Sequence, residues 1–183
     1  RESWSLRYYL VFNIEQADNV TPRNTVEPTE VQPIELIPTA EAIYNNYPNS
    51  PTLEHGGSSA HYVPSQDHVQ MPNANQFFDI DSYYKTLFHE LIHSTGHSSR
   101  LKRKSLVDIK RSGDELYSKE ELVAEIGAWY LTGLCNLDPK DSMVNSQAYI
   151  NGWVKKLQEQ EKEVIYAMSQ ALKGVELIIG KGG

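Results

Sequence analysis

The chain has 183 residues, enough for one domain with a sizeable core, and its 39% hydrophobic and 22% charged residues are ordinary for a soluble globular protein. A net charge of −7 argues against a broad electrostatic grip on nucleic acid, and no apolar run approaches the roughly 20 residues of a membrane helix. The single cysteine, Cys135, cannot form an internal disulfide, so we expect a cytoplasmic protein in which it is a small packing residue.

We expect one domain over residues 1–183. The chain starts at Arg1 without a Met or a signal segment, which indicates a piece of a longer protein. Residues 7–14 are β-branched and aromatic enough to form an inner strand. Prolines recur between residues 18 and 38, as in a surface connector. Thr39 is the predicted N-cap of a short helix that stops before Pro48.

Short strands separated by turns are predicted at residues 52–55, 60–63 and 67–71, forming a small, mostly antiparallel sheet. Residues 67–71 alternate polar and apolar side chains, as a half-buried strand does. This strand comes just before the central helix, so it could border a cleft and pair with an extended substrate through free backbone groups.

The next element is a helix from about Ser82 to Thr95, around which the rest of the chain is organised. Asp79 or Asp81 can cap its start, and Gly96 ends it. Apolar residues recur along it at helical spacing and are the predicted core. They are Tyr84, Leu87, Phe88, Leu91 and Ile92.

This helix carries the sequence His89-Glu90-Leu91-Ile92-His93. Residues four apart share a helix face, so His89 and His93 can point two imidazoles at one ion, with Glu90 beside them. Zinc binds neutral imidazole readily, and a carboxylate beside a metal-activated water is what a metal-dependent hydrolase needs. The motif therefore predicts a zinc site in which Glu90 is the general base.

A loop is predicted from about residue 98 to 117, with a basic cluster that we interpret as a solvated turn rather than a track for phosphates. The cluster comprises Arg100, Lys102, Arg103 and Lys104. Ser118 and Glu121 form a capping box for a helix over residues 119–131. A last long packing helix runs from about residue 142 to 178 and is expected to break near Gly174.

Two His are too few for zinc, so a third protein ligand is needed. His97 is one candidate, but on a continuous helix it would lie about 12 Å from His89, too far to share an ion unless the chain folds back at Gly96. Glu121, on the following helix, is the better candidate, and a site with neither residue stays open. A third His, as in metzincins, would fall at Ser99, which cannot replace it.

Glu121 and Glu125 are four residues apart and share a helix face. One carboxylate can therefore bind the metal while the other accepts the outer N–H of a ligand His. Ala124 leaves room for the two helices to approach closely. Glu120, beside Lys119, fits a solvated acidic face better.

Several blocks of the sequence together resemble the C-terminal metallopeptidase domain of ArdC-type antirestriction proteins, a zincin-like domain also found in polyvalent proteins of phages and conjugative elements. The blocks extend over nearly the whole chain and are more specific than the five-residue motif alone. They are Val11-Phe12-Asn13 with Gln16, Ala60-His61-Tyr62-Val63-Pro64, Asp67 with Met71-Pro72, Tyr83 through Glu90, His93 through His97, Arg100-Leu101 and Glu120 through Glu125.

The resemblance implies an α+β, zincin-like fold, with a small sheet packed on the helix that carries the motif and on two further C-terminal helices. It implies a gluzincin-like site in which Glu121, followed by Ala124, joins His89 and His93 on Zn²⁺. Relatives usually carry an N-terminal domain that binds single-stranded DNA. The resemblance implies that the present chain begins where that domain ends, and that any DNA binding would belong to that domain.

The resulting hypothesis is a zinc metallopeptidase of a mobile element that acts on a protein or peptide substrate. Zinc acidifies a water, and Glu90 takes its proton and later passes it to the leaving amine. Tyr62, His97 and Tyr117 are candidate donors to the oxyanion. The alternative is a non-catalytic zincin scaffold that protects DNA or blocks a restriction enzyme by binding. A toxin-like or DNA-modifying hydrolase is disfavoured by the acidic charge.

Overall fold

The computed structural model describes residues 35–107, 115–139 and 161–181, all of which belong to one compact unit, Pro33–Gly183. The remaining unit of the chain, Arg1–Gln32, lies outside the described residues. The predicted strand at 7–14, most of the proline-rich connector and the first half of the predicted C-terminal helix therefore also lie outside them. A single domain over the whole chain stays a prediction.

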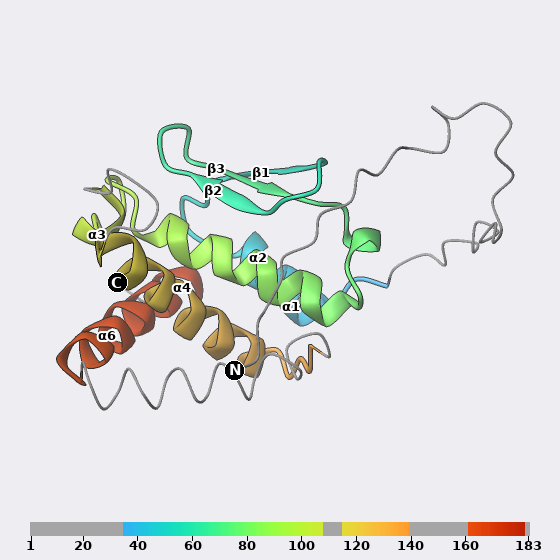
Figure 1. Cartoon of the computed structure of the whole chain (residues 1–183). Helices are drawn as coiled ribbons and strands as arrows, with labels where there is room; N and C mark the ends of the chain where they lie inside the picture. The colour runs from blue at the N-terminus through green and yellow to red at the C-terminus, as the bar shows by residue number, and fades with distance from the viewer. Residues whose placement is uncertain (1–34, 108–114, 140–160, 182–183) are drawn as a thin grey trace, which may run out of the picture. The chain divides into compact units, whose positions relative to one another are not determined.

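A three-stranded sheet lies along one side of the described unit, in the order β1-β3-β2 (Figure 1). Its strands are β1 (Thr52–His55), β2 (His61–Val63) and β3 (His68–Met71). β3 pairs in parallel with β1 and antiparallel with β2, so the sheet is mixed rather than mostly antiparallel. Because β3 is the central strand, its backbone groups are paired on both sides, and the expectation that it could bind an extended substrate is wrong.

Helix α2 (Ile80–Thr95) carries the predicted motif and runs beneath the sheet (Figure 1). Its N-cap is Asp79, whose carboxylate accepts the backbone N–H of Ser82 at 2.7 Å. Gly96 follows as the C-cap, as predicted. The capping chemistry read from the sequence therefore places the start and end of this helix within two residues.

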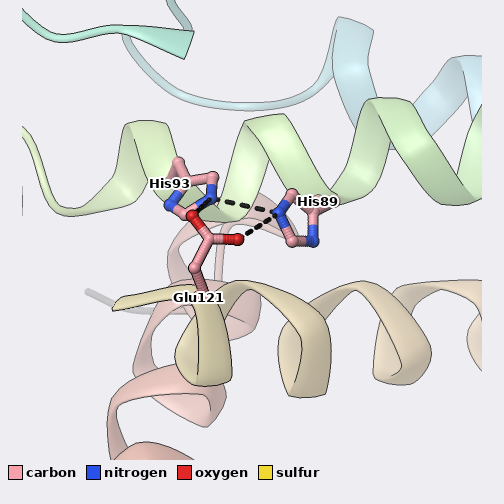
Figure 2. Close-up of side chains that lie close together, drawn as sticks. All are labelled: His89, His93 and Glu121. Carbon is pink, nitrogen blue, oxygen red and sulfur yellow. Dashed lines mark hydrogen bonds and ion pairs between the residues drawn. The ribbon is translucent and has the colours of Figure 1, made fainter. Parts of the chain in front are cut away.

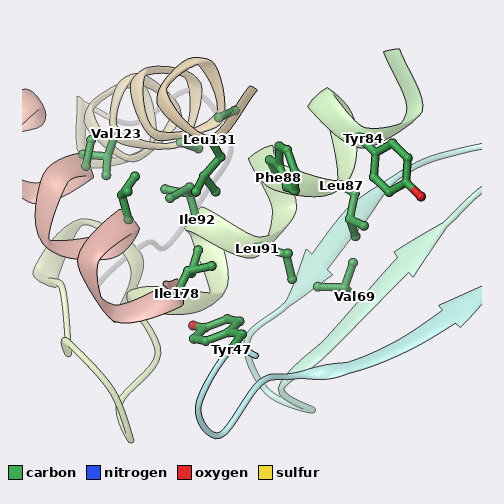
Figure 3. Packing of buried hydrophobic residues seen from close by; sticks show 14 of the residues in the cluster. Tyr47, Val69, Tyr84, Leu87, Phe88, Leu91, Ile92, Val123, Leu131 and Ile178 are labelled. Carbon is green, nitrogen blue, oxygen red and sulfur yellow. The ribbon is translucent and has the colours of Figure 1, made fainter. Parts of the chain in front are cut away.

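The predicted apolar stripe of α2 is the centre of the hydrophobic core. Tyr84, Leu87, Phe88, Leu91 and Ile92 are each at most 1% exposed. Figure 3 shows this stripe between the sheet, which contributes Val69, and the two later helices, which contribute three of the other labelled apolar side chains. These are Val123, Leu131 and Ile178. A core that surrounds α2 on several sides holds the motif helix rigidly.

Helices α4 (Glu115–Leu134) and α6 (Glu161–Ile178) pack against α2, where two glycines allow close contact. A Cβ at Gly127 of α4 would lie 2.6 Å from Ile92 Cδ1, and one at Gly174 of α6 would lie 2.9 Å from Thr95 Oγ1. Gly174 was expected to break the last helix, but it lies within α6 because its missing side chain makes room for α2.

Several predicted boundaries differ from the structure. Helix α1 (Pro38–Asn45) begins with Pro38 in its first turn, so Thr39 lies inside it and is not the cap. α4 starts at Glu115, so Ser118 is also inside a helix, and the predicted capping box is wrong. Short elements not predicted are η2 (Ala74–Gln76) and α3 (Lys104–Val107), which interrupts the predicted loop. In the described part of the chain, no helix has a stretch both long and apolar enough to cross a membrane.

Candidate metal centre

His89 and His93 project from the same face of α2 toward α4, as their spacing predicts (Figure 2). Their Nε2 atoms lie 3.1 Å apart. Glu121 reaches them from α4, with its Oε2 3.4 Å from His89 Nε2 and its Oε1 3.6 Å from His93 Nε2. The structure thus brings together the three residues that the sequence names as metal ligands.

The spacing of these three donors fits a single small ion. Ligand atoms on a tetrahedral zinc, with bonds of about 2.0–2.1 Å, lie about 3.3 Å from one another. One ligand atom from each residue can be chosen so that all lie within 4.8 Å of one another, and the closest donor pairs are near the tetrahedral value. Two imidazoles and one carboxylate leave a further position open, which is typical of catalytic rather than structural sites.

Glu125 holds the outer nitrogen of the first imidazole. Its Oε2 lies 3.3 Å from His89 Nδ1, so a proton on Nδ1 leaves Nε2 free to face the ion. The other carboxylate oxygen lies 3.3 Å from Lys85 Nζ and accepts the indole N–H of Trp129 at 3.0 Å. Glu125 thus lies where the sequence analysis placed the second carboxylate of the pair, against the outer nitrogen of a His.

Glu120 contacts the outer nitrogen of the second imidazole, that of His93. The sequence analysis did not predict this contact. Its Oε1 lies 3.3 Å from His93 Nδ1, and the residue is only 1% exposed. The expectation that Glu120 belongs to a solvated acidic face is wrong. It is buried because its carboxylate pairs with Arg103 and accepts the Ser105 hydroxyl at 2.6 Å.

The basic cluster after the motif divides into two kinds of residue. Lys102 and Lys104 are exposed, as predicted for a solvated turn. The side chains of Arg100 and Arg103 are only 4% and 1% exposed, and both form ion pairs, with Asp67 and Glu120 respectively. Arginine on a loop has no periodic pattern that signals burial, so the sequence offered no cue to these two partners.

The pKa values describe a site that attracts positive charge. Burial lowers the pKa of His89, but hydrogen bonds with Glu121 and Glu125 outweigh it and raise that pKa to about 9. Burial raises the pKa of Glu120, but hydrogen bonds from His93 and Arg103 lower it to about 2. Both shifts have the same cause, the close approach of carboxylates to positively charged partners, and both favour positive charge at this site.

Glu90 is 8% exposed and lies on α2 directly after His89. Among the described residues, its carboxylate makes no hydrogen bond or ion pair with the protein. Its charge acts on the neighbouring His89, and a carboxylate without a hydrogen bond to the described residues is available to accept a proton from a water or to hold a substrate group.

Two of the three candidate donors to the oxyanion have other partners in the structure. A ring nitrogen of His97 lies 2.7 Å from the Ser99 hydroxyl, and His97 is not part of the cluster of metal donors. Tyr62 donates its hydroxyl to Asp67 at 2.8 Å. The Tyr117 side chain lies outside the described residues.

A helix with two histidines one turn apart, a glutamate from a second helix and a small covering sheet define a zincin-like protein. The sequence model of the zincin-like metallopeptidase family matches residues 38–170, which is more than half of the chain. The chain belongs to this family.

The chain is also similar to individual proteins. The chain is 37% identical over 175 residues to the DNA primase TraC of Escherichia coli, a match that covers 92% of this chain and 15% of TraC. It is 30% identical to the Mn(II)-bound crystal structure of the antirestriction protein ArdC from plasmid R388, with a TM-score of 0.63, covering 80% of this chain and 52% of that one. The metal-free ArdC structure gives a TM-score of 0.60. The chain thus spans only part of each relative.

Proposed function

We propose that the chain is the metallopeptidase domain of an antirestriction protein and hydrolyses peptide bonds. The observation that carries this proposal is the combination of three metal donors at ligand spacing with Glu90, a buried carboxylate next to them. The similarity to ArdC supports the antirestriction context.

His89, His93 and Glu121 would hold a divalent cation, which supplies Lewis acidity to a water and to the substrate carbonyl. Glu90 accepts the proton released as the water attacks, and returns it to the leaving amine. Glu120 and Glu125, which contact the outer nitrogens of the two imidazoles, would accept their Nδ1–H groups and so leave both Nε2 atoms to the cation.

Zn²⁺ is the proposed metal, since two imidazoles and one carboxylate are a common zinc ligand set. The same donors also accept Mn²⁺, the ion in the ArdC structure. Metal analysis of protein purified without added metal, followed by titration with each ion against a competing chelator, distinguishes the two. Zinc is the expected outcome, and preferential retention of manganese would overturn this part of the proposal.

The peptidase proposal is tested on a mixed protein substrate, because no single substrate is identified. A denatured bacterial proteome is incubated with the parent protein and Zn²⁺ or Mn²⁺, and newly formed amino termini are labelled and identified by mass spectrometry. The parent should create new termini, whereas Glu90→Gln should bind metal normally and create none. If the metal-loaded parent creates none, or Glu90→Gln cleaves as well, the catalytic assignment fails.

A second candidate is a scaffold that protects DNA by contacting it or a restriction enzyme. It is favoured by the similarity to both metal-bound and metal-free ArdC, which have nearly equal TM-scores to this fold. A plasmid cleavage assay with a restriction enzyme separates the candidates: Glu90→Gln retains protection if binding suffices and loses it if proteolysis is required.

A further inference from the structure

Arg103 is a charged residue that the fold hides almost completely, with only 2% of its surface exposed. Its Nε donates to Glu120 Oε2 at 3.1 Å, and its Nη2 donates to the other oxygen of the same carboxylate. The guanidinium also donates to the Ile92 carbonyl at 2.8 Å and to the Thr95 hydroxyl. One side chain therefore connects Glu120 to the last turn of the motif helix.

The carboxylate that Arg103 grips is the one that faces His93. Glu120 Oε1 lies 3.3 Å from His93 Nδ1, while Oε2 accepts the Ser105 hydroxyl at 2.6 Å. Both oxygens thus have fixed partners, and the carboxylate has little freedom to rotate. Its orientation sets the ring orientation of His93.

Stability alone does not account for this arrangement. A buried ion pair is often no more stabilising than apolar residues of similar volume, because both charges must be desolvated. The pair instead fixes direction, since the planar guanidinium fork holds a carboxylate in one plane.

Gly96 makes room for the guanidinium. Its φ of −78° is accessible to any residue, so backbone strain does not require glycine there. A Cβ at this position, however, would lie 2.9 Å from the Arg103 guanidinium carbon. An alanine here would require the guanidinium to shift, so the glycine after the motif leaves the space that Arg103 occupies.

Glu125, the carboxylate that contacts His89, is restrained differently from Glu120. Glu125 is paired with Lys85, and their side chains are 13% and 20% exposed, against 1% for both Glu120 and Arg103. An ammonium on a flexible stem restrains a carboxylate less than a bidentate guanidinium does. The carboxylate that contacts His93 is thus held more rigidly than the one that contacts His89.

We propose that Arg103 is a positioning residue that, acting through Glu120 and in the space left by Gly96, presets His93 for metal binding. The proposal rests on the metal site described under Proposed function. It assigns Arg103 no contact with metal or substrate.

The test uses Arg103→Lys, which keeps the charge but loses the fork, and Gly96→Ala, which displaces the guanidinium without removing it. Lys104→Gln, at an exposed neighbouring position, is the matched control. Affinity for Zn²⁺ and for Mn²⁺ is measured by competition with a chromophoric chelator, and thermal unfolding of metal-free protein is followed in parallel. Both variants should bind about 10–100-fold more weakly, in the range known for residues behind a ligand His, and the control should match the parent.

A nitrogen-15 NMR spectrum of the imidazoles in metal-free protein separates positioning from plain stabilisation. In the parent, the His93 ring should carry its proton on Nδ1, facing Glu120, and both variants should lose this preference while remaining folded. Parent-like affinity and an unchanged His93 tautomer in folded Arg103→Lys would overturn the proposal. If Arg103→Lys does not fold, the same readouts in Gly96→Ala decide it. If the parent itself binds no metal, the proposed function fails, whereas the tautomer still reports on Arg103.

Discussion

Ile92 of α2 packs directly against Gly127 of α4: a Cβ at Gly127 would lie 2.6 Å from Ile92 Cδ1 and 2.7 Å from its Cγ1. The two helices approach this closely because Gly127 has no side chain. His93 follows Ile92, and Glu121 lies on α4 before Gly127, so the same contact brings the carboxylate within reach of the imidazoles.

Gly127→Ala should therefore weaken both the fold and the metal centre. Overpacking at this contact should lower the free energy of unfolding by about 1–3 kcal/mol, and separation of α4 from α2 should reduce metal affinity. Denaturant unfolding and chelator competition measure the two effects. Gly133→Ala is the control, since no atom lies within 4 Å of a Cβ there. An alanine at this helical site should be neutral or stabilise by up to about 1 kcal/mol.

Metal should stabilise the folded chain through Glu121. At a free Zn²⁺ or Mn²⁺ concentration of about 100 times the Kd, binding should add roughly 2.7 kcal/mol to the free energy of unfolding. Addition of EDTA should reverse the increase in Tm. Glu121→Gln removes the charged donor from α4, so its Tm should not respond to the same metal concentration. An equal response in this variant would remove Glu121 from the ligand set.

Glu125→Gln tests the contact between Glu125 and the outer nitrogen of His89. The neutral amide is a weaker acceptor for His89 Nδ1–H, and it loses the ion pair with Lys85. Metal affinity should fall by about 10–100-fold, while the circular dichroism spectrum should match that of the parent. Glu176→Gln, at an exposed position on α6, removes the same charge far along the sequence and should leave the affinity unchanged. Equal losses in the two variants would mean that net charge, rather than the contact with His89, matters.

Asp67 should make the fold sensitive to acid. Arg100 contacts its carboxylate through both terminal nitrogens, one of them at 2.9 Å, and also donates to the Ser94 carbonyl at 2.8 Å. Burial raises the pKa of Asp67, but the hydrogen bonds from Arg100 and Tyr62 outweigh it and lower that pKa below 3.8. The carboxylate therefore stabilises the fold above about pH 4, and this contribution is lost as the pH falls through the lowered pKa.

Asp67→Asn should be less stable than the parent by about 1–3 kcal/mol at pH 7, the usual range for a hydrogen bond to a charged group. At pH 3 the difference should shrink, because protonation also weakens the parent's contact. Urea unfolding at the two pH values measures it. A stability difference that does not change with pH would show that the charge of Asp67 is not what stabilises the turn between β2 and β3.

The sequence by itself determined the parts of this protein that depend on local spacing. The four-residue repeat places His89 and His93 on one face of α2, Asp79 and Gly96 mark its ends, and the apolar stripe from Tyr84 to Ile92 is buried as predicted. The zincin-like α+β class was also predicted correctly, through the resemblance of several sequence blocks to a known family.

Only the tertiary structure decided which charged side chains are buried and which glycines lie at helix contacts. Arg103 and Glu120 look like surface residues in the sequence, and they are buried because each neutralises the other beneath His93. Gly174 is expected from the sequence to break its helix, yet at this position, as at Gly127, the missing side chain makes room for the neighbouring helix α2. Charge burial and close helix contact depend on partners far away in the chain, and periodicity along one segment does not encode them.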